Sequence, residues 1–500
     1  MHVALGNDEH WIAIGVEVQD AAHVRVRDED GVFAEARVRA RASLERSVDE
    51  ERERDGHRLT AGCFTAPRVL KIAALTAAMK LCSFHLMPYT DLPADFAERY
   101  PSVWIDVPAE LFDPERGHTL YNDFLDQLEL ADAVGFDGVC VNEHHSNAYG
   151  LMPSPNLMAA ALARRTADAA LIVLGDSLAL YNPPIRVAEE IAMLDCISGG
   201  RVIAGFPVGT PQDTCFAYGQ VPGTLRDKYR EAHDLVLRAW TERRPFAFNG
   251  RFTQLRHVNI WPRPLQRPHP PVWIPGGGSV ETWQWCAERD YVYCYLSYFG
   301  YKLGRRTLGG FWNAMRELGK DHNPYRAGFL QFVGVAETRA EALALYREAT
   351  EYFYGRSLHV SSRWVNPPGY VSEATLRARA ESMVGLAAQR ASEKRFFNQP
   401  IFEEAVAEGY VVLGSPDEVA AELRELALDL NVGHLLLLLQ FGNMANDLAR
   451  YNIRMFAERV APQLRDLFSS EWANRWWPRS LSADRRRGAR GSATGRDASK

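Results

Sequence analysis

The sequence VCVNEHH, residues 139–145, changes from an apolar run to a cluster of polar side chains within one short stretch. An uninterrupted apolar run is typical of a parallel β-strand that is buried on both faces. Glu143, His144 and His145 would then lie at the carboxyl end of that strand. Since α/β-barrel enzymes carry their active sites at the carboxyl ends of their strands, this stretch predicts both a strand and a polar site.

Strand and helix patterns alternate on both sides of this stretch. Leu120–Val134 has an apolar helical face, and the glycines of Gly135–Gly138 mark the turn into the strand. The alternation recurs along the chain, and a helical pattern follows each of eight predicted strands. These strands are Leu81–Leu86, Val139–Val141, Ala170–Leu174, Val202–Phe206, Val272–Ile274, Val292–Tyr295, Phe329–Val335 and Val432–Leu439.

Eight repeated strand–helix units predict an α/β fold in the form of a closed (β/α)8 TIM barrel. An open doubly wound sheet is the alternative, but no G-x-G-x-x-G motif follows the first predicted strand. Three segments interrupt the alternation and are predicted to be loop insertions. They are the proline- and aromatic-rich segment 88–118, the polar segment 246–270 and the irregular segment 355–410, which includes helical pieces.

The two ends of the chain differ in composition from its middle. Residues 1–78 are dominated by Arg, Glu, Asp, Ala and Val and lack a clear apolar period, which predicts a poorly ordered extension outside the core. Its charge-dense part, residues 34–58, is compatible with a solvated helix or with disorder. Residues 79–468 are predicted to form the barrel domain, and residues 469–500 a basic, disordered tail.

Composition and charge argue against several classes of protein. The formal net charge of −6 provides no overall basic field for nucleic acid. The longest purely aliphatic run, Leu435–Leu439, is far too short to cross a bilayer. The 7 cysteines include no C-x-x-C pair, which favours a reduced, cytoplasmic protein over a disulfide scaffold or a zinc site.

The polar cluster Glu143-His144-His145 favours acid–base chemistry over metal binding. Zinc needs further ligands at set spacings, and the H-E-x-x-H motif is absent, so no metal is predicted. Imidazole titrates near neutral pH, which suits a general acid or base, or contact with a cofactor. A lone histidine is more often structural, but two of them after an acid at a strand end favour a site.

Several further stretches, together with Glu143-His144-His145, resemble the bacterial luciferase-like monooxygenase family. They occur in the family's order and spacing between about Met79 and Leu467. The stretches are Asn182–Asp195 (NPPIRVAEEIAMLD), Ser198–Arg201 (SGGR), Pro271–Ser279 (PVWIPGGGS) and Gly414–Val419 (GSPDEV). Each is weak alone, but several in register are specific. The family fold is a (β/α)8 barrel, in agreement with the strand count.

The resemblance implies a cofactor, partners and site residues. Family members bind reduced flavin mononucleotide (FMN), usually supplied by a separate reductase, and use it with O2 to oxidise a second substrate. A homodimer is also implied. By position, His144 resembles the family's active-site histidine, and Glu143 and His145 flank it. The residues that resemble the phosphate-binding segment are Gly277, Gly278, Ser279 and Thr282, and those that resemble the segment against the flavin ring are Asp176, Ser177 and Leu178.

Two features of these segments bear on flavin binding. A glycine-rich turn at a helix start offers backbone N–H groups to a phosphate, which suits Gly277–Ser279. Family members often have a non-prolyl cis peptide in the ring segment. In luciferase proper an arginine in the loop after the fourth strand meets the flavin phosphate, whereas this chain has Val208 there. Arg226 and Lys228, on the next predicted helix, are candidates to replace it.

The leading hypothesis is a flavin-dependent monooxygenase that oxidises a small, apolar organic substrate. Aromatic residues gather at Tyr291–Tyr301 and in the loops at the same barrel end, and they are typical either of an apolar cavity or of barrel packing. Two alternatives remain open. One is a deazaflavin-dependent oxidoreductase that transfers hydride, and the other is a non-catalytic, flavin-binding partner subunit.

Overall fold

The structure is a computed structural model that describes residues 2–7, 10–20, 23–27, 33–37, 78–296, 298–381, 401–469 and 471–486. The chain divides into two compact units, Met1–Ile72 and Ala73–Lys500. In the first unit, four antiparallel strands pair in chain order. They are β1 (His2–Asn7), β2 (His10–Asp20), β3 (His23–Arg27) and β4 (Phe33–Arg37).

The sequence analysis did not predict these four strands. The β2 sequence HWIAIGVEVQD places an apolar residue at every second position from Ile12 to Val18, which is the period-two pattern of a strand. Residues 34–58 were predicted to be a helix or disordered, and residues 34–37 belong to β4 instead. The rest of that segment lies outside the described residues.

Eight parallel strands of the second unit form a closed barrel. They are β5 (Lys80–Phe84), β6 (Gly138–Val141), β7 (Ala170–Leu174), β8 (Val202–Gly205), β11 (Val272–Gly276), β12 (Val292–Tyr295), β13 (Ala327–Val335) and β15 (His434–Leu438). Each pairs with the next of these strands, and β15 pairs back with β5, which closes the ring. The predicted TIM barrel is confirmed. A further strand, β14 (Val411–Gly414), pairs with the carboxyl half of β13 and was not predicted.

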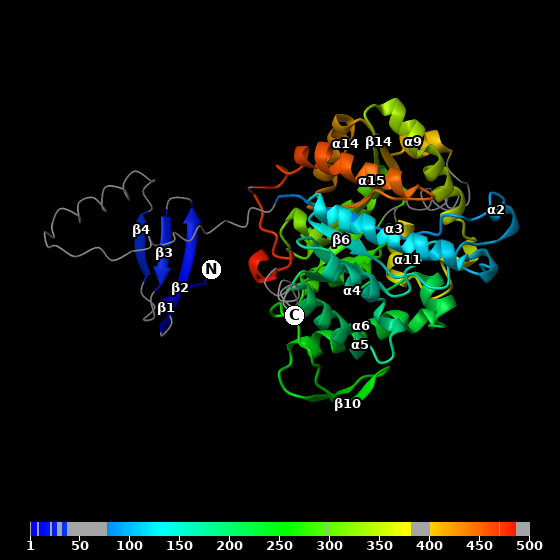
Figure 1. Cartoon of the computed structure of the whole chain (residues 1–500). Coiled ribbons are helices and arrows are strands. Elements are labelled where there is room, and N and C mark those ends of the chain that lie inside the picture. The colour runs from blue at the N-terminus through cyan, green and yellow to red at the C-terminus, as the bar shows by residue number, and fades with distance from the viewer. Residues whose placement is uncertain are drawn as a thin grey trace, which may run out of the picture. The chain divides into compact units, whose positions relative to one another are not determined.

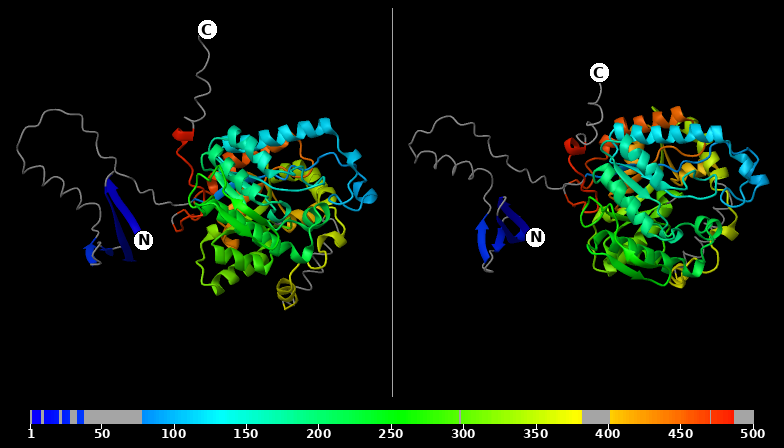
Figure 2. Two further views of the ribbon diagram at one scale, coloured as in Figure 1. Left: turned by 90° about the horizontal axis from the view of Figure 1, so that it is seen from below. Right: turned by 60° about the horizontal axis from the view of Figure 1, so that its bottom comes forward.

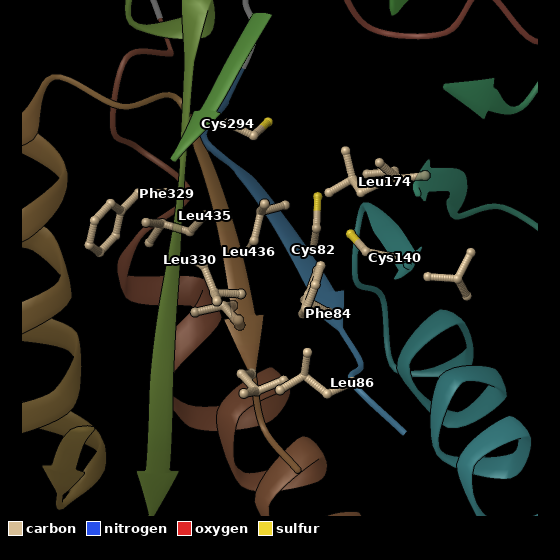
Figure 3. Close-up of a cluster of buried hydrophobic side chains, with 14 of the residues drawn as sticks. Cys82, Phe84, Leu86, Cys140, Leu174, Cys294, Phe329, Leu330, Leu435 and Leu436 are labelled. Atoms are coloured by element: carbon tan, nitrogen blue, oxygen red, sulfur yellow. The ribbon is translucent and has the colours of Figure 1, made fainter. Parts of the chain in front are cut away.

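Apolar side chains fill the interior of the barrel. Cys82 and Phe84 from β5, Cys140 from β6 and Leu436 from β15 lie close together there (Figure 3). Every residue of β6, β7, β8 and β15 is buried. Strands that are buried on both faces read as continuous apolar runs, which is why the sequence pattern located them. The polar residues that follow the strands are thereby left at the rim of the barrel.

Helices cover the outside of the barrel (Figures 1 and 2). The long helices are α3 (Pro114–Ala133), α4 (Pro155–Arg165), α5 (Ile185–Ser198), α6 (Pro222–Thr241), α7 (Val280–Arg289), α8 (Gly300–Glu317), α9 (Arg339–Tyr352), α14 (Pro416–Leu430) and α15 (Asn446–Met455). Local signals set their ends: Asp113 caps α3, Ser415 forms a capping box at α14, and Gly199 ends α5 in the left-handed conformation. None of the helices in the described part of the chain is long and apolar enough to cross a membrane.

The insertions contain more regular structure than the sequence analysis predicted. Segment 246–270 includes a hairpin of β9 (Phe246–Asn249) and β10 (Gln254–Val258), which projects from the barrel (Figure 1). Short helices occupy the other two insertions: α2 (Phe96–Arg99), η1 (Ala109–Leu111), η5 (Phe353–Ser357), α10 (Ser362–Val365), α11 (Glu373–Glu381) and α13 (Phe402–Ala407). The remaining short helices are η2 (Leu178–Leu180), η3 (Gln212–Ala217), η4 (Pro324–Arg326), η6 (Phe456–Val460) and η7 (Ala461–Gln463).

Residues 471–486 pack at the amino-terminal ends of the barrel strands. The Asn474 amide nitrogen lies 3.0 Å from Nε2 of His434, the first residue of β15. The indole N–H of Trp476 donates to the Asp290 carbonyl just before β12, at 2.6 Å. This part of the predicted tail therefore has defined partners on the barrel, and residues 487–500 lie outside the described residues.

Candidate active site

The predicted site residues lie at one end of the barrel, at the carboxyl ends of three strands. Glu143, His144 and His145 follow β6, Asp176 and Ser177 follow β7, and Ser279 follows β11. Because all strands of the barrel run parallel, their carboxyl ends meet at the same rim. The opposite end of the barrel is covered by residues 471–486.

An aspartate that the sequence analysis did not identify holds both histidines. Asp213, in η3, accepts a hydrogen bond from Nδ1 of His144 at 2.9 Å through one carboxylate oxygen. Its other oxygen accepts from the backbone N–H of His145, also at 2.9 Å. The Asn147 amide and the Thr210 hydroxyl donate to the same carboxylate, at 3.1 and 2.8 Å. The carboxylate thus holds the segment after β6, which contains His144 and His145, against the loop after β8, which contains Thr210.

The surroundings of Asp213 determine its charge and the form of His144. Burial raises the pKa of Asp213, but the neighbouring His144 and the hydrogen-bond donors outweigh this effect and hold the pKa below its usual range. The ionised carboxylate accepts only, so Nδ1 of His144 carries a proton. In a neutral imidazole this leaves Nε2 as the acceptor. His144 therefore has one tautomer selected by its partner, as in other oriented acid–base histidines.

Aromatic rings surround His144. The ring of Tyr149 meets His144 edge-on, with 4.7 Å between the centroids, and Trp104 stacks on Tyr149 at 4.2 Å. The hydroxyl of Tyr149 donates to the hydroxyl of Tyr298, which follows β12. On the other side, Tyr218 packs against His145 at 4.3 Å. Trp104 comes from the insertion 88–118, so this loop contributes directly to the site.

Glu143 connects the ends of β6 and β7. One carboxylate oxygen accepts from the backbone N–H of Ser177 at 2.6 Å, and the other accepts from the hydroxyl of Tyr181 at 2.9 Å. Nε2 of His145 lies 3.1 Å from the second oxygen, but the angles are not those of a hydrogen bond. Glu143 therefore holds the segment Ser177–Tyr181 in place while facing His145.

Asp176 is fully buried beside Glu143. Burial raises its pKa well above the usual range, and the charges of Glu143 and Glu190 raise it further. One of its oxygens accepts from the Asn156 amide at 3.0 Å. Leu178 is also fully buried, at the start of η2. The cis peptide bonds among the described residues all precede prolines (Pro183, Pro262 and Pro268), so the non-prolyl cis bond expected in this segment is not present.

The glycine-rich turn before α7 forms a small cluster of hydroxyl and guanidinium donors. Ser279, the residue before α7, lies 2.8 Å from Thr282 between their hydroxyl oxygens. The Arg226 guanidinium, from α6, reaches Ser279 at 3.4 Å and Thr282 at 3.5 Å. Such long contacts are weak, which leaves the guanidinium donors available to an anion.

The backbone of this turn requires glycine. Gly278 has a φ of +98°, a conformation that residues with a side chain rarely adopt. A Cβ atom there would also approach Thr307 to 3.0 Å, whereas the space beside Gly277 is open. Val208, in the loop after β8, has no charge to offer, while Lys228 bonds Gln220 at 2.8 Å. Of the two cations considered from the sequence, Arg226 is the one that contacts this turn.

Several buried polar atoms at this end of the barrel have no hydrogen-bond partner within the protein. They are Trp104 Nε1, Asn142 Oδ1, His145 Nε2, Asp176 Oδ2 and Gln440 Oε1. An unpaired buried polar group is costly, by about 1–3 kcal/mol each. The polar edge of a flavin ring carries both hydrogen-bond donors and acceptors, which can pair with these nitrogen and oxygen atoms. The phosphate of a flavin nucleotide supplies an anion to the α7 turn. The residues present thus fit a flavin.

A family model described as luciferase-like monooxygenase matches residues 108–430. The match covers most of the barrel domain and includes the β6 end, Asp213 and the α7 turn. The chain belongs to the luciferase-like monooxygenase family. The resemblance read from the sequence is therefore confirmed.

Luciferase-like relatives match this chain over part of their length. The oxygenase component of a flavin-dependent trigonelline monooxygenase from Acinetobacter baylyi is 31% identical over 167 residues, which cover 32% of this chain and 45% of that protein. Limonene 1,2-monooxygenase from Rhodococcus erythropolis is 33% identical over 126 residues, covering 25% of this chain and 32% of the relative. The chain thus spans half or less of the length of these curated relatives.

Solved structures share the barrel. The oxygenating constituent of 3,6-diketocamphane monooxygenase from Pseudomonas putida, in complex with FMN, aligns with a TM-score of 0.58 at 20% identity, over 77% of this chain and 99% of that one. An F420-dependent secondary alcohol dehydrogenase aligns with a TM-score of 0.53 at 18% identity, over 78% of this chain and 100% of that one. At these identities the likeness shows the fold alone.

Proposed function

We propose that this protein is a flavin-dependent monooxygenase that uses reduced FMN and O2 to oxidise a small, apolar organic substrate. The observation that carries the proposal is the buried His144–Asp213 pair at the carboxyl end of the barrel, in a chain of the luciferase-like family. A separate reductase supplies the reduced flavin, in keeping with a relative that is named an oxygenase component. A cytoplasmic location and a homodimer are part of the same proposal.

The α7 turn holds the flavin phosphate in this proposal. Ser279 and Thr282 provide hydroxyl donors, and Arg226 provides the positive charge that Val208 lacks. A helix amino terminus adds the favourable end of its dipole. Asp176, Ser177 and Leu178 would hold the ring, and Glu143 fixes the backbone of Ser177 there.

His144 transfers a proton at its Nε2 atom. Asp213 keeps Nδ1 protonated and the ring oriented, so Nε2 is the atom available to the reacting groups. Reduced FMN, when bound, supplies the electrons for the reaction with O2. Trp104, Tyr149 and Tyr298 surround the histidine with apolar surface, which favours an apolar substrate and excludes water from the reacting atoms.

Two alternatives have specific tests. The first is deazaflavin-dependent hydride transfer, since an F420-dependent dehydrogenase shares the barrel fold. The test is to titrate the protein with FMN and with F420, and then to measure O2 uptake with photoreduced FMN. Tight F420 binding without FMN binding would replace the proposal. FMN binding without any turnover of a broad panel of apolar substrates would favour the non-catalytic partner subunit, although the oriented His144 argues for catalysis.

Replacing His144 tests its role. We expect His144→Ala to bind FMN within a few-fold of wild type and to lose substrate oxidation by about 10²-fold or more, since a positioned acid–base group contributes roughly 10²–10⁴-fold. FMN fluorescence titration measures the first quantity, and O2 uptake coupled to product mass measures the second. His257→Ala, at an exposed position of β10, is the control. Oxidation at the wild-type rate in His144→Ala would make this histidine structural.

A further inference from the structure

A connected set of polar side chains extends from Glu143, beside His145, to Glu190 on α5. The proposed function assigns it no role in the reaction. The Tyr181 hydroxyl lies 2.9 Å from a Glu143 oxygen and 3.2 Å from an Asp176 oxygen, so it bridges the two acids. The Asn156 amide nitrogen bridges in the same way between Asp176, at 3.0 Å, and Glu190, at 2.9 Å. Three carboxyl groups are thus joined through two shared donors.

A proton on one of the acids would give both contacts of the Tyr181 hydroxyl a hydrogen. A tyrosine hydroxyl has a single hydrogen, so Tyr181 donates to only one of its two neighbours. If it donates to Glu143, which is the nearer, then its contact with Asp176 is a hydrogen bond only when Asp176 itself donates. Asp176 is then a neutral carboxylic acid, and the direction of donation runs from Asp176 through Tyr181 to Glu143.

Charges around Asp176 support the same assignment. The groups that face it are Glu143, Glu190, Tyr181 and Asn156, and none of them is a cation. Arg186 bonds Glu190 at 2.6 Å, but its side chain is 74% exposed and neutralises only that outer acid. Burial first, and then Glu143 and Glu190, raise the pKa of Asp176 well above its usual range. Two adjacent carboxyl groups in a buried site do not ionise together.

The inner end of the set meets His145. Nε2 of His145 lies 3.1 Å from the Glu143 oxygen that also accepts from Tyr181. This nitrogen has no hydrogen-bond partner within the protein, although His145 is only 5% exposed. The backbone of His145 is fixed by Asp213 at 2.9 Å, so only the side chains need to rotate for a hydrogen bond to form with Glu143.

We propose that Asp176, Tyr181 and Glu143 form a proton relay that delivers a proton to His145; this relay rests on the proposed function, because it serves the flavin site. In one transfer, the Asp176 proton moves to the Tyr181 oxygen, the Tyr181 proton moves to Glu143, and Glu143 passes a proton to Nε2 of His145. Each step breaks one bond to hydrogen and forms another, and no electrons change hands. Asp176 is left as a carboxylate.

The relay has a means of being recharged and a use for the proton. Glu143 and Asp176 are buried and Tyr181 is partly exposed, so we place the return of a proton from solvent at Tyr181. In a monooxygenase reaction one atom of O2 leaves as water and must acquire two hydrogens. The relay supplies one proton to His145, which neighbours His144 in the chain. His144 is oriented by Asp213, whereas His145 receives its proton from Glu143.

The first test needs no flavin. We expect the infrared spectrum of the wild-type protein near neutral pH to show the C=O stretch of a buried, protonated carboxyl group. Asp176→Asn should remove this band, and Asp95→Asn, at an exposed position, should not. A spectrum of Asp176→Asn identical to that of the wild type would overturn the relay, because no proton is then stored on Asp176.

The second test separates the relay from the function. Tyr181→Phe removes only the bridging hydroxyl. We expect it to bind FMN as the wild type does and to reoxidise bound, photoreduced FMN with O2 at least about tenfold more slowly, with partial rescue by a small weak acid in the buffer. Tyr346→Phe, which loses a buried hydroxyl bonded to the Val335 carbonyl at 2.8 Å, is the matched control.

The outcomes are distinct. Wild-type reoxidation by Tyr181→Phe, with FMN binding intact, would overturn the relay and leave the proposed function standing. A wild-type protein that binds no FMN would overturn the proposed function, and the relay with it.

Discussion

At the scale of single residues, Asp213 decides the chemistry of the β6 end. It bonds the side chain of His144 and the backbone of His145, and its own charge is maintained by those contacts. Asp176 lies beside Glu143 at the end of β7, and its pKa is shifted in the opposite direction to that of Asp213. Hydrogen-bond donors and His144 lower the pKa of Asp213, whereas burial and like charges raise the pKa of Asp176, and such a separation of pKa values lets acid and base groups act at one pH.

Replacing Asp213 should affect turnover more than cofactor binding. In Asp213→Asn the amide can donate to Nδ1 of His144 and so favour the other tautomer, in which Nε2 carries the proton. We expect kcat for substrate oxidation to fall by about 10²-fold or more, with the Kd for FMN changed only a few-fold. Steady-state kinetics and FMN titration measure the two effects. Asp227→Asn, which alters an exposed acid of α6, is the control; equal losses in both variants would contradict the role given to Asp213.

Asp176 should make stability fall as pH rises. Its pKa is raised in the folded protein, while an unfolded aspartate titrates at about 3.9. Above that pH the unfolded chain releases a proton that the folded chain retains, so stability from this group is full below pH 4 and is lost as pH rises towards the folded pKa. We expect Asp176→Asn to gain stability relative to wild type between pH 4 and 7, by at most about 1.4 kcal/mol per pH unit.

Denaturant titrations at several pH values measure this difference. A constant offset between wild type and Asp176→Asn across the range would show that Asp176 is ionised in the folded protein. Asp95→Asn, at an exposed position, should give curves parallel to those of the wild type.

At the scale of secondary-structure elements, the proposed phosphate site before α7 depends on two helices. α7 begins just after Ser279, and α6 brings Arg226 to within 3.4 Å of the Ser279 hydroxyl. The loop after β8 offers Val208 where luciferase proper has an arginine, so the cation reaches the turn from the following helix instead. In the proposed function Arg226 therefore takes the place of that arginine, from a different element.

Removing the Arg226 charge should weaken the binding of FMN but not of riboflavin, which lacks the phosphate. A charge-assisted hydrogen bond contributes about 1.5–3 kcal/mol, so we expect Arg226→Ala to raise the Kd for FMN by about 10- to 100-fold. Fluorescence titrations with both ligands measure the effect. Lys228→Ala, on the same helix but bonded to Gln220, should leave both affinities unchanged. Equal weakening of FMN and riboflavin by Arg226→Ala would assign Arg226 a structural role.

At the scale of the whole molecule, the barrel closes without the first seventy-two residues. β5 begins at Lys80 and pairs with both β6 and β15, and residues 471–486 cover the other end of the strands. The four strands β1–β4 form a sheet of their own within the first unit. All the residues assigned to the site belong to the second unit.

A chain that begins at Met79 should therefore fold and bind FMN as the full chain does. We expect its thermal midpoint to lie within a few degrees of that of the full chain, with the same Kd for FMN, because all the strands that close the barrel begin at or after Lys80. Thermal unfolding and FMN titration measure these quantities. Aggregation of the shortened chain, or loss of FMN binding, would show that residues 1–78 belong to the functional fold.

Much of the fold is readable from the sequence because its signals are local. The strands β6, β7 and β15 are continuous apolar runs, and the helix ends carry their own signals, such as Ser415 with Glu418. β14 and the hairpin β9–β10 were missed, since strands of four or five residues without a continuous apolar run carry too few positions for a clear period. The period-two pattern of β2 was present in the sequence and was overlooked.

By itself, the sequence determined the barrel, the family and the polar cluster at residues 143–145, because each depends on residues that are adjacent in the chain. Only the tertiary structure brought Asp213 to His144, across 69 residues, and Arg226 to Ser279, across 53. The raised pKa of Asp176 likewise comes from burial and from the acids Glu143, after β6, and Glu190, on α5, that fold against it. Hydrogen bonds and charges act over a few ångströms in space, so the electrostatics of a site follow from which strand ends and helices the closed barrel places side by side.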